Sequence, residues 1–155
     1  MINIGDMKIL KITSVAFEEG GKIPSKYTCD GENINPPFKI ENIPPEAKSL
    51  ALIADDPDAP SGVWVHWTVW NIDPNINKIT EGNVPKGAIE GQTSFGNSGY
   101  GGPCPPSGSH HYLFKFYALD TKLDLPVETN NDELEGFIRN HLIASGGLTG
   151  IYERD

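Results

Sequence analysis

The sequence predicts a mainly β protein whose strands are joined by long loops. Glycine and proline contribute 17 and 13 of the 155 residues, and they fall between apolar segments. Those segments are rich in β-branched and aromatic residues and alternate with a period of two, which is typical of strands. The strand–helix–strand rhythm of a doubly wound α/β fold does not recur, so that class is disfavoured.

Six segments have the composition and alternation of strands. We expect strands at Ile9–Phe17, Phe38–Glu41, Ser49–Ala54, Val63–Ile72, His111–Leu119 and Leu148–Glu153. Glycine- and proline-rich stretches separate them, as expected of turns and loops. No repeat, heptad or linker-like stretch divides the chain, so we expect one domain over residues 1–155, with residues 1–7 as a dispensable lead.

One amphipathic helix is expected over Asn130–Leu142. Asp132 and Glu133 suit the positive end of its dipole. Its apolar residues form a single stripe at helical spacing: Leu134, Phe137, Ile138 and Leu142. Gly146 and Gly147 are expected to end it.

Charge and cysteine content exclude several classes. The net charge of −9 is mixed along the chain, and no basic stripe or zinc-finger spacing indicates nucleic-acid binding. No apolar run approaches the ~20 residues that a bilayer crossing needs, and the first residues lack the apolar core of a secretory signal, so we expect a cytoplasmic location without membrane insertion. A Cys29–Cys104 disulfide would contribute ~4–5 kcal/mol, but a reducing cytosol favours free thiols.

Carboxylates follow the segment Ser49–Ala54 directly. In the sequence Asp55-Asp56-Pro57-Asp58-Ala59-Pro60, the prolines restrict the backbone and display the carboxylates on a stiff strand end. A solvated turn is the alternative interpretation. The next predicted strand has apolar residues on both faces, and alternation places four side chains on one of them: Trp64, His66, Thr68 and Trp70. A histidine buried there needs a partner for its ring nitrogens.

A glycine- and proline-rich loop, GYGGPCPPSGSHHY over residues 99–112, leads into the predicted strand His111–Leu119. Alternation places His110 and Tyr112 on the face of Phe114 and Phe116, which we assign to the interior. His111 lies on the face of Lys115, which we assign to solvent or a polar rim. The two adjacent histidines therefore cannot serve one pocket.

Three chemistries use such residues. A Ser-His-Asp hydrolase needs an exposed nucleophilic serine, and Asn97-Ser98-Gly99 only partly matches the required elbow. A zinc or iron site uses two histidines and a carboxylate, but the short spacings that preorganise such sites are absent. An anion site uses loop backbone N–H groups, imidazoles and the Tyr112 hydroxyl as donors, with Asp56 fixing a histidine.

Three motifs, Asp56-Pro57-Asp58-Ala59-Pro60, Trp64-Val65-His66-Trp67 and residues 101–112, resemble in order those of the phosphatidylethanolamine-binding protein family, also called the Raf kinase inhibitor protein family. The block Cys29-Asp30-Gly31-Glu32-Asn33 with Asn35-Pro36-Pro37 resembles its short bacterial and archaeal branch. The resemblance covers about Ile12 to Tyr152. It implies a sandwich of two antiparallel sheets with Greek-key links and one or two short helices.

The resemblance also implies a pocket for phosphate- or carboxylate-bearing ligands, including phosphorylated headgroups. The expected ligand-binding residues are Asp56, Asp58, Ala59, His66, Gly102, Cys104, Pro105, Pro106, His110 and Tyr112. No catalytic residue, metal or cofactor is implied, and the chain is expected to be a monomer or homodimer. The alternatives are a pocket-independent inhibitor or scaffold of a kinase or protease, and a weak metal- or His-dependent hydrolase.

Two departures from the family pattern bear on these expectations. His111 stands where the family usually has arginine, so a permanent cation is replaced by a group that is mostly neutral at pH 7. The sequence ends soon after Tyr152, without the C-terminal helix that lies beside the pocket in animal members. Partner interactions of those members are therefore not transferred.

Overall fold

Two β-sheets form the core of the computed structural model, which describes residues 8–154. The large sheet has the strand order β1-β10-β9-β5-β6-β8, with β3 also paired to β10. Its strands are β1 (Lys8–Ile9), β3 (Gly21–Lys22), β5 (Ser49–Asp56), β6 (Trp64–Ile72), β8 (Ile89–Glu90), β9 (Ser109–Leu119) and β10 (Leu142–Glu153). The small sheet has the order β2-β4-β7 and consists of β2 (Lys11–Thr13), β4 (Phe38–Glu41) and β7 (Lys78–Ile79).

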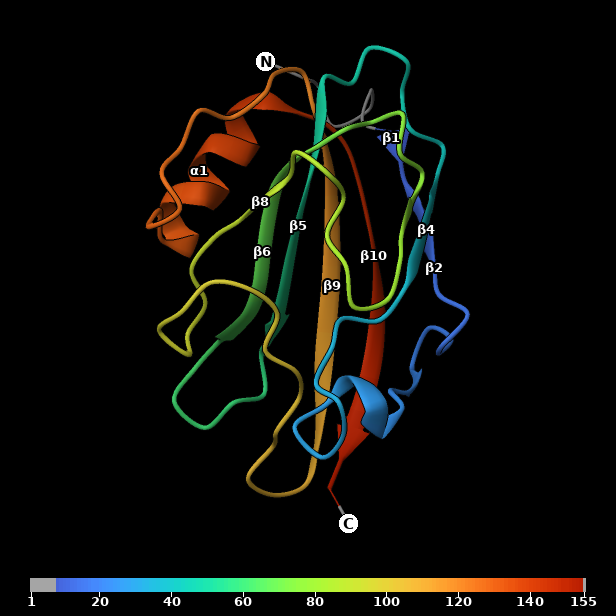
Figure 1. Ribbon diagram of the computed structural model, residues 1–155, viewed down its shortest axis with the longest axis vertical. Helices are drawn as coiled ribbons and strands as arrows, with labels where there is room; N and C mark the ends of the chain where they lie inside the picture. Colours follow the sequence, from blue (N-terminus) through green and yellow to red (C-terminus); the bar gives the residue numbers. More distant parts are fainter. Residues whose placement is uncertain (1–7, 155) are drawn as a thin grey trace.

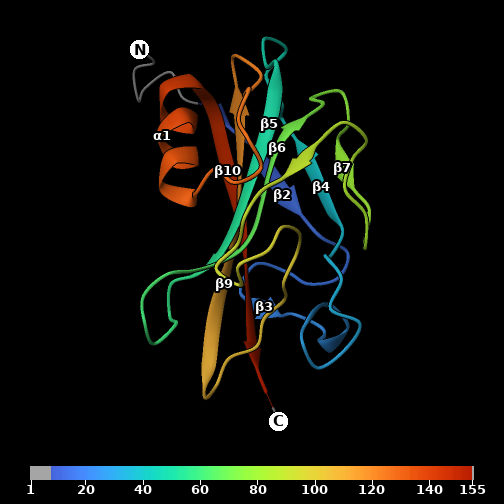
Figure 2. The ribbon, with the colours of Figure 1, turned by 60° about the vertical axis from the view of Figure 1, so that its left-hand side comes forward.

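The large sheet is covered on both faces (Figure 2). The small sheet packs on one face, and the ring centroid of Phe38 lies 4.9 Å from that of Phe114 and 5.3 Å from that of Phe116. Helix α1 (Asn131–His141) packs on the other face over a smaller apolar cluster, which includes Ile53, Trp70, Leu134 and Ile138. The predicted mainly β class with two sheets is confirmed.

The long strands run side by side through the molecule (Figure 1). β5 pairs antiparallel with β6 and β9, and β9 pairs antiparallel with β10. The short strands β1 and β3 instead run parallel to β10, so the expectation of a wholly antiparallel sheet is wrong at these two strands. A short 3-10 helix, η2 (Ser25–Tyr27), lies beside the C-terminal end of β10, far from α1 (Figure 1).

Helix α1 lies within the predicted helix over Asn130–Leu142, but the predicted stop is wrong. The Asn130 side chain caps the helix by accepting a hydrogen bond from the Glu133 backbone N–H at 2.8 Å. The helix ends at His141, and Gly146 lies inside β10, where an added Cβ would come within 2.1 Å of the Leu10 carbonyl oxygen. Close approach of the residue that links β1 to β2 therefore explains this glycine. Among residues 8–154, no helix has the length and apolar character needed to cross a bilayer.

Several predicted strand limits differ from the structure. The expected strand Ile9–Phe17 is replaced by β1 and β2, which pair in different sheets. β5 continues through the two aspartates at its end, and β10 begins six residues before the expected Leu148. The short strands β3, β7 and β8 carry too few residues for alternation to reveal them.

Cys29 and Cys104 form a disulfide, so the expectation of free thiols is wrong. That expectation rested on the redox state of the predicted compartment, whereas the fold brings the two Cα atoms to 5.5 Å across a separation of 75 residues. Disulfides persist mainly in oxidising environments, although redox-active and thermophile proteins carry them inside cells. The cytoplasmic location stays a prediction.

Candidate functional site

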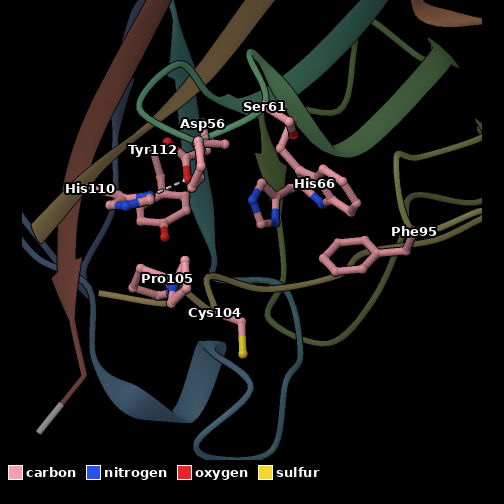
Figure 3. Close-up of a pocket in the computed structure, with 12 residues that line it drawn as sticks. Asp56, Ser61, His66, Phe95, Cys104, Pro105, His110 and Tyr112 are labelled. Atoms are coloured by element: carbon pink, nitrogen blue, oxygen red, sulfur yellow. Dashed lines mark hydrogen bonds and ion pairs between the residues drawn. The ribbon is translucent and has the colours of Figure 1, made fainter. Parts of the chain in front are cut away.

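A pocket of about 250 Å³ opens where β5 ends and where β6 and β9 begin. Figure 3 shows its side chains. Most of the predicted site residues line it: Asp56, Ala59, His66, Cys104, Pro105, Pro106, His110 and Tyr112. Four further residues complete the lining: Pro60, Ser61, Trp64 and Phe95. The structure thus gathers residues from three strands and two loops around one cavity.

A buried carboxylate–imidazole pair lies at one side of the pocket. The His110 Nδ1–H donates to Asp56 Oδ2 at 2.6 Å, and the two side chains are 8% and 5% exposed. The other Asp56 oxygen accepts the backbone N–H of Asp58 at 2.8 Å. Both carboxylate oxygens are therefore engaged within the protein, and Asp56 fixes the orientation of His110 with Nε2 as its remaining ring nitrogen.

A β-bulge directs His66 into the pocket. Ala54 pairs with Trp67 and Asp55 pairs with Val65, so His66 is an extra residue opposite the step between them. The bulge turns Trp67 to the main-core side, and Trp70 packs in the cluster beneath α1. The prediction that His66 and Trp70 share a face is therefore wrong, because strict alternation assumes an uninterrupted ladder.

The environment of His66 favours its neutral form. Nδ1 lies 2.6 Å from the Gly101 carbonyl oxygen, which can only accept, so Nδ1 carries a proton and Nε2 is the remaining nitrogen. Burial lowers the pKa of His66 below its ordinary value, while the Gly101 carbonyl and the charge of Asp56 partly oppose the shift. The ring becomes an imidazolium only when acid or an incoming anion stabilises the charge.

Tyr112 lies between the two imidazoles (Figure 3). Its ring centroid is 5.3 Å from that of His66 and 6.4 Å from that of His110. The hydroxyl oxygen is buried and meets no protein group in hydrogen-bond geometry. Burial, followed by the nearby charge of Asp56, raises the pKa of Tyr112, so the phenol keeps its proton and remains a donor. The hydroxyl is thus a donor without a protein acceptor beside the two imidazoles, and a ligand atom reaches it only when neighbouring side chains shift.

The glycine-rich wall does not offer the amide nest that the sequence predicts. The Gly101 N–H donates to the His66 carbonyl oxygen at 3.0 Å, and the Gly102 N–H donates to Asn33 Oδ1 at 2.8 Å. Prolines at 103, 105 and 106 have no N–H. Gly102 does not line the pocket, and an added Cβ would lie 2.3 Å from the Tyr27 carbonyl oxygen. This glycine therefore serves close packing behind the wall.

Asp58 also lies outside the lining and forms a second carboxylate–imidazole pair. It accepts the His111 backbone N–H at 2.8 Å and the His111 Nδ1–H at 2.7 Å. These hydrogen bonds hold the pKa of Asp58 below its usual range. As predicted, His110 is buried and His111 is exposed. Where the family usually has arginine, this chain therefore places an exposed imidazole that pairs with Asp58.

An aromatic wall completes the pocket, and sequence analysis missed it. The rings of Trp64 and Phe95 meet edge to face with centroids 5.4 Å apart, and Phe95 is also 5.4 Å from His66. Alternation had already placed Trp64 on the face of His66, which was a usable signal. No sequence signal marked Phe95. Its loop is held at the site by a long-range hydrogen bond, in which the Ser94 N–H donates to the Val65 carbonyl oxygen at 2.9 Å.

The polar groups of the pocket decide which ligand chemistry it can accept. Within the described part of the chain, no three His, Cys, Asp or Glu side chains gather as metal ligands. Asp56 uses both carboxylate oxygens within the protein, so the polar side chains of the lining that are left for a ligand are His66, His110, Tyr112 and Ser61. Protonated imidazoles and a phenol are hydrogen-bond donors, which suits an acceptor-rich ligand.

The family profile described as phosphatidylethanolamine-binding protein matches residues 13–153, and the chain belongs to this family. It is 47% identical over 150 residues to a UPF0098 protein of Methanothermobacter thermautotrophicus, covering 94% of this chain and 99% of that one. A UPF0098 protein of Chlamydia muridarum is 41% identical over 151 residues, covering 94% and 100%. These names carry no established enzymatic reaction.

Two crystal structures have the same fold over nearly the whole chain. One is described as a putative phosphatidylethanolamine-binding protein homolog from Chlamydia trachomatis. It matches with a TM-score of 0.91 and 40% identity, covering 96% of this chain and 99% of that one. The other is Escherichia coli YbcL, described as a new member of the mammalian family. It matches with a TM-score of 0.88 and 31% identity, covering 94% and 99%.

Proposed function

We propose that the pocket binds a small anion, either a phosphate or carboxylate group or a phosphorylated headgroup. The observation that carries this proposal is that two histidine rings of the pocket are each held by a hydrogen bond at Nδ1. His66 and His110 each use Nδ1 within the protein, which leaves Nε2 for a ligand in the cavity that both line. Together with the Tyr112 hydroxyl, these atoms provide three donors once the rings are protonated, and hydrogen bonds from imidazolium to an anion are charge-assisted.

The chemistry of the two histidines predicts binding coupled to proton uptake. The carboxylate of Asp56 holds the His110 ring by a hydrogen bond, whereas burial disfavours the charged form of His66. An anion next to His66 opposes the burial effect and raises the pKa of that ring. Affinity is therefore expected to increase as the pH falls from about 7.5 to about 5.5. Phosphate monoesters gain a proton near pH 6, so sulfate, which stays ionised, isolates the contribution of the protein.

The apolar part of the lining favours an anion with a short substituent. Trp64 and Phe95 form an edge-to-face wall beside His66, and prolines 60, 105 and 106 complete the apolar rim. Aromatic faces attract an ammonium group within about 6 Å of the ring centroid. Phosphoethanolamine combines both features, so it is expected to bind more tightly than inorganic phosphate.

Histidine NMR signals test the proposal within one sample. The chain has four histidines, of which His66 and His110 line the pocket, whereas His111 and His141 do not. Millimolar phosphate, sulfate or phosphoethanolamine is expected to shift the ring signals of the first two, with larger effects at the lower pH. The signals of His111 and His141 serve as internal controls. Unchanged signals in a folded protein at both pH values would contradict the proposal.

Two matched alanine variants locate the binding. His110→Ala removes a pocket donor and is expected to weaken phosphate affinity by at least about tenfold, which corresponds to about 1.4 kcal/mol. His111→Ala changes the neighbouring, outward-facing histidine and is expected to leave the affinity within about twofold. Equal losses in both variants would show that binding does not depend on the pocket.

Modulation of a kinase or protease stays a prediction. His66→Ala separates its two possible routes, because the side chain lies within the pocket and not on the outer surface. Inhibition through the pocket is expected to disappear in this variant, whereas inhibition through another surface is expected to persist. The measurement is the residual activity of the partner enzyme in the presence of each protein.

A further inference from the structure

The Cys29–Cys104 disulfide joins the pocket wall to a separate segment of the chain. Cys104 lines the cavity together with Pro105 and Pro106. In Figure 3 its sulfur points away from His66, toward the segment that contains η2. Cys29 lies in that segment, two residues after η2 ends at Tyr27. The disulfide therefore fastens the wall from the side opposite the ligand.

Hydrogen bonds to other segments hold residues 100–103 of the pocket wall, which is the loop segment 99–108. The Tyr100 hydroxyl donates to the Tyr27 carbonyl oxygen at 2.7 Å, and the Pro103 carbonyl oxygen accepts the Cys29 N–H at 3.1 Å. Across residues 104–108, the described chain forms no hydrogen bond or ion pair with any other segment. Cys104 is thus the last cross-link before β9 begins at Ser109, and the pocket-lining Pro105 and Pro106 follow it directly.

The partner segment is anchored independently of the disulfide. Asp30 accepts hydrogen bonds from the Tyr152 hydroxyl at 2.6 Å and from Arg154 Nη2 at 2.9 Å, which ties the segment to the end of β10. Glu81 binds Lys26 and Tyr27 from the other side. Breaking the disulfide therefore frees the wall and leaves the segment around η2 in place.

Both cysteines of the disulfide are exposed. A thiolate can therefore approach a sulfur without prior unfolding, which is the first requirement for exchange. A disulfide that only staples a core is normally enclosed by it. Cys29–Cys104 differs from such a buried structural disulfide in two ways. Both of its cysteines are exposed, and it lies where the hydrogen-bonded part of the wall ends.

We propose that Cys29–Cys104 is a thiol–disulfide exchange site at which a dithiol reductant opens the anion pocket. One thiolate of the dithiol attacks a protein sulfur, the S–S bond breaks, and a mixed disulfide forms. The second thiol of the dithiol then attacks the dithiol's own sulfur in the mixed disulfide. This bond breaks, the protein cysteine leaves as a thiol, and the reductant closes to an internal disulfide. Two electrons and two protons pass to the protein, which then carries two thiols. The effect on ligand affinity rests on the anion-binding function proposed above.

The exchange reaction and the release of the wall are tested without any ligand. Native protein is treated with dithiothreitol, the thiols are captured with iodoacetamide, and amide hydrogen exchange is compared between the oxidised and reduced forms. Both cysteines are expected to be alkylated without denaturant. Exchange is expected to accelerate at the amides of Cys29, Gly101 and Gly102, whose hydrogen bonds hold the wall, and to stay unchanged in β5. Resistance to native reduction, equal exchange in both forms, or faster exchange throughout the sheets would each overturn the proposal.

Inorganic phosphate tests the effect on the pocket. Reduction is expected to weaken phosphate binding by at least about tenfold, and reoxidation is expected to restore it. The double variant Cys29→Ser/Cys104→Ser should bind phosphate as the reduced protein does and should not respond to dithiothreitol. Equal affinity in oxidised and reduced protein would overturn the control of the pocket. Failure of the oxidised protein to bind phosphate would instead refute the anion-binding function, while the exchange experiment still decides whether the wall is released.

Discussion

Two neighbouring carboxylate–imidazole pairs of the molecule have the same geometry and differ mainly in their burial. Asp56–His110 and Asp58–His111 join the same two regions of the chain, with Nδ1-to-oxygen distances of 2.6 and 2.7 Å. The first pair has side chains that are 5% and 8% exposed, and the second has side chains that are 40% and 56% exposed. Distance alone therefore does not distinguish a pocket component from a surface contact.

Burial changes what each pair can do. Water solvates the polar groups of Asp58 and His111 whether or not they meet, so an exposed pair adds little to stability. The charge on buried Asp56 has lost its water and depends on His110 and the Asp58 N–H. A buried pair is also screened less by salt, which preserves its influence on a ligand in the pocket. The buried pair is therefore the one suited to binding.

The largest difference between the pairs is expected in stability. Asp56→Ala leaves His110 buried without its acceptor and is expected to reduce the free energy of unfolding by about 3 kcal/mol. Asp58→Ala leaves His111 in contact with water, so the reduction in the free energy of unfolding is expected to be much smaller. Urea unfolding at pH 7 measures both variants. Equal losses would show that burial is not the deciding difference.

The next difference concerns pH, and His66 provides a buried imidazole without a direct carboxylate partner. Its pKa is lower in the folded protein than in the unfolded chain, so the unfolded chain binds the proton more readily. Stability is therefore expected to fall as the pH decreases from the unfolded value near 6.5 through the folded pKa. His66→Gln, whose amide can still donate to the Gly101 carbonyl oxygen, is expected to flatten this dependence.

The control for the pH experiment is His141→Gln. His141 is 38% exposed and donates Nδ1–H to Asp120 at 2.8 Å, so it is a histidine of the outer surface. This variant is expected to keep the slope of the unmodified protein between about pH 5 and pH 7. The carboxylates with lowered pKa values, Asp30, Asp58 and Glu81, titrate below this window. A slope that persists in His66→Gln would assign the dependence to another group.

The smallest expected effect is the response of the exposed pair to salt. Hydrogen bonds from His111 lower the pKa of Asp58, so the contribution of this pair is present above the unfolded pKa of Asp58 and is lost as the pH falls through the folded value. Salt at about 1 M, where the Debye length is about 3 Å, should move the Asp58 pKa toward its ordinary value. Carboxyl ¹³C NMR titration measures the shift, and His111→Ala should move it further in the same direction. A salt-insensitive pKa would indicate that Asp58 is shielded from solvent.

Alternation predicted β9 well because its pairing with β10 runs without a bulge from Ser109 to Ala118. His110, Tyr112 and Phe116 therefore face inward as expected, and β5 adds a second regular ladder from Leu113 onward. The same reasoning failed along β6, where the extra residue His66 shifts the side chains that follow it. A bulge depends on how many residues the partner strand places opposite, and β6 alone does not contain that information.

The mainly β class, the amphipathic helix, the family and most of the pocket lining could be predicted before the structure was known. These properties follow from local periodicity and from motifs of neighbouring residues. The tertiary structure was needed to show that Asp56 meets His110, that the Gly101 and Gly102 amides are already bonded, and that the disulfide fastens the wall. Each of these contacts joins residues far apart along the chain. Which residues meet depends on how all strands and loops pack together and pair their hydrogen-bonding groups. The sequence of a single segment does not specify that arrangement.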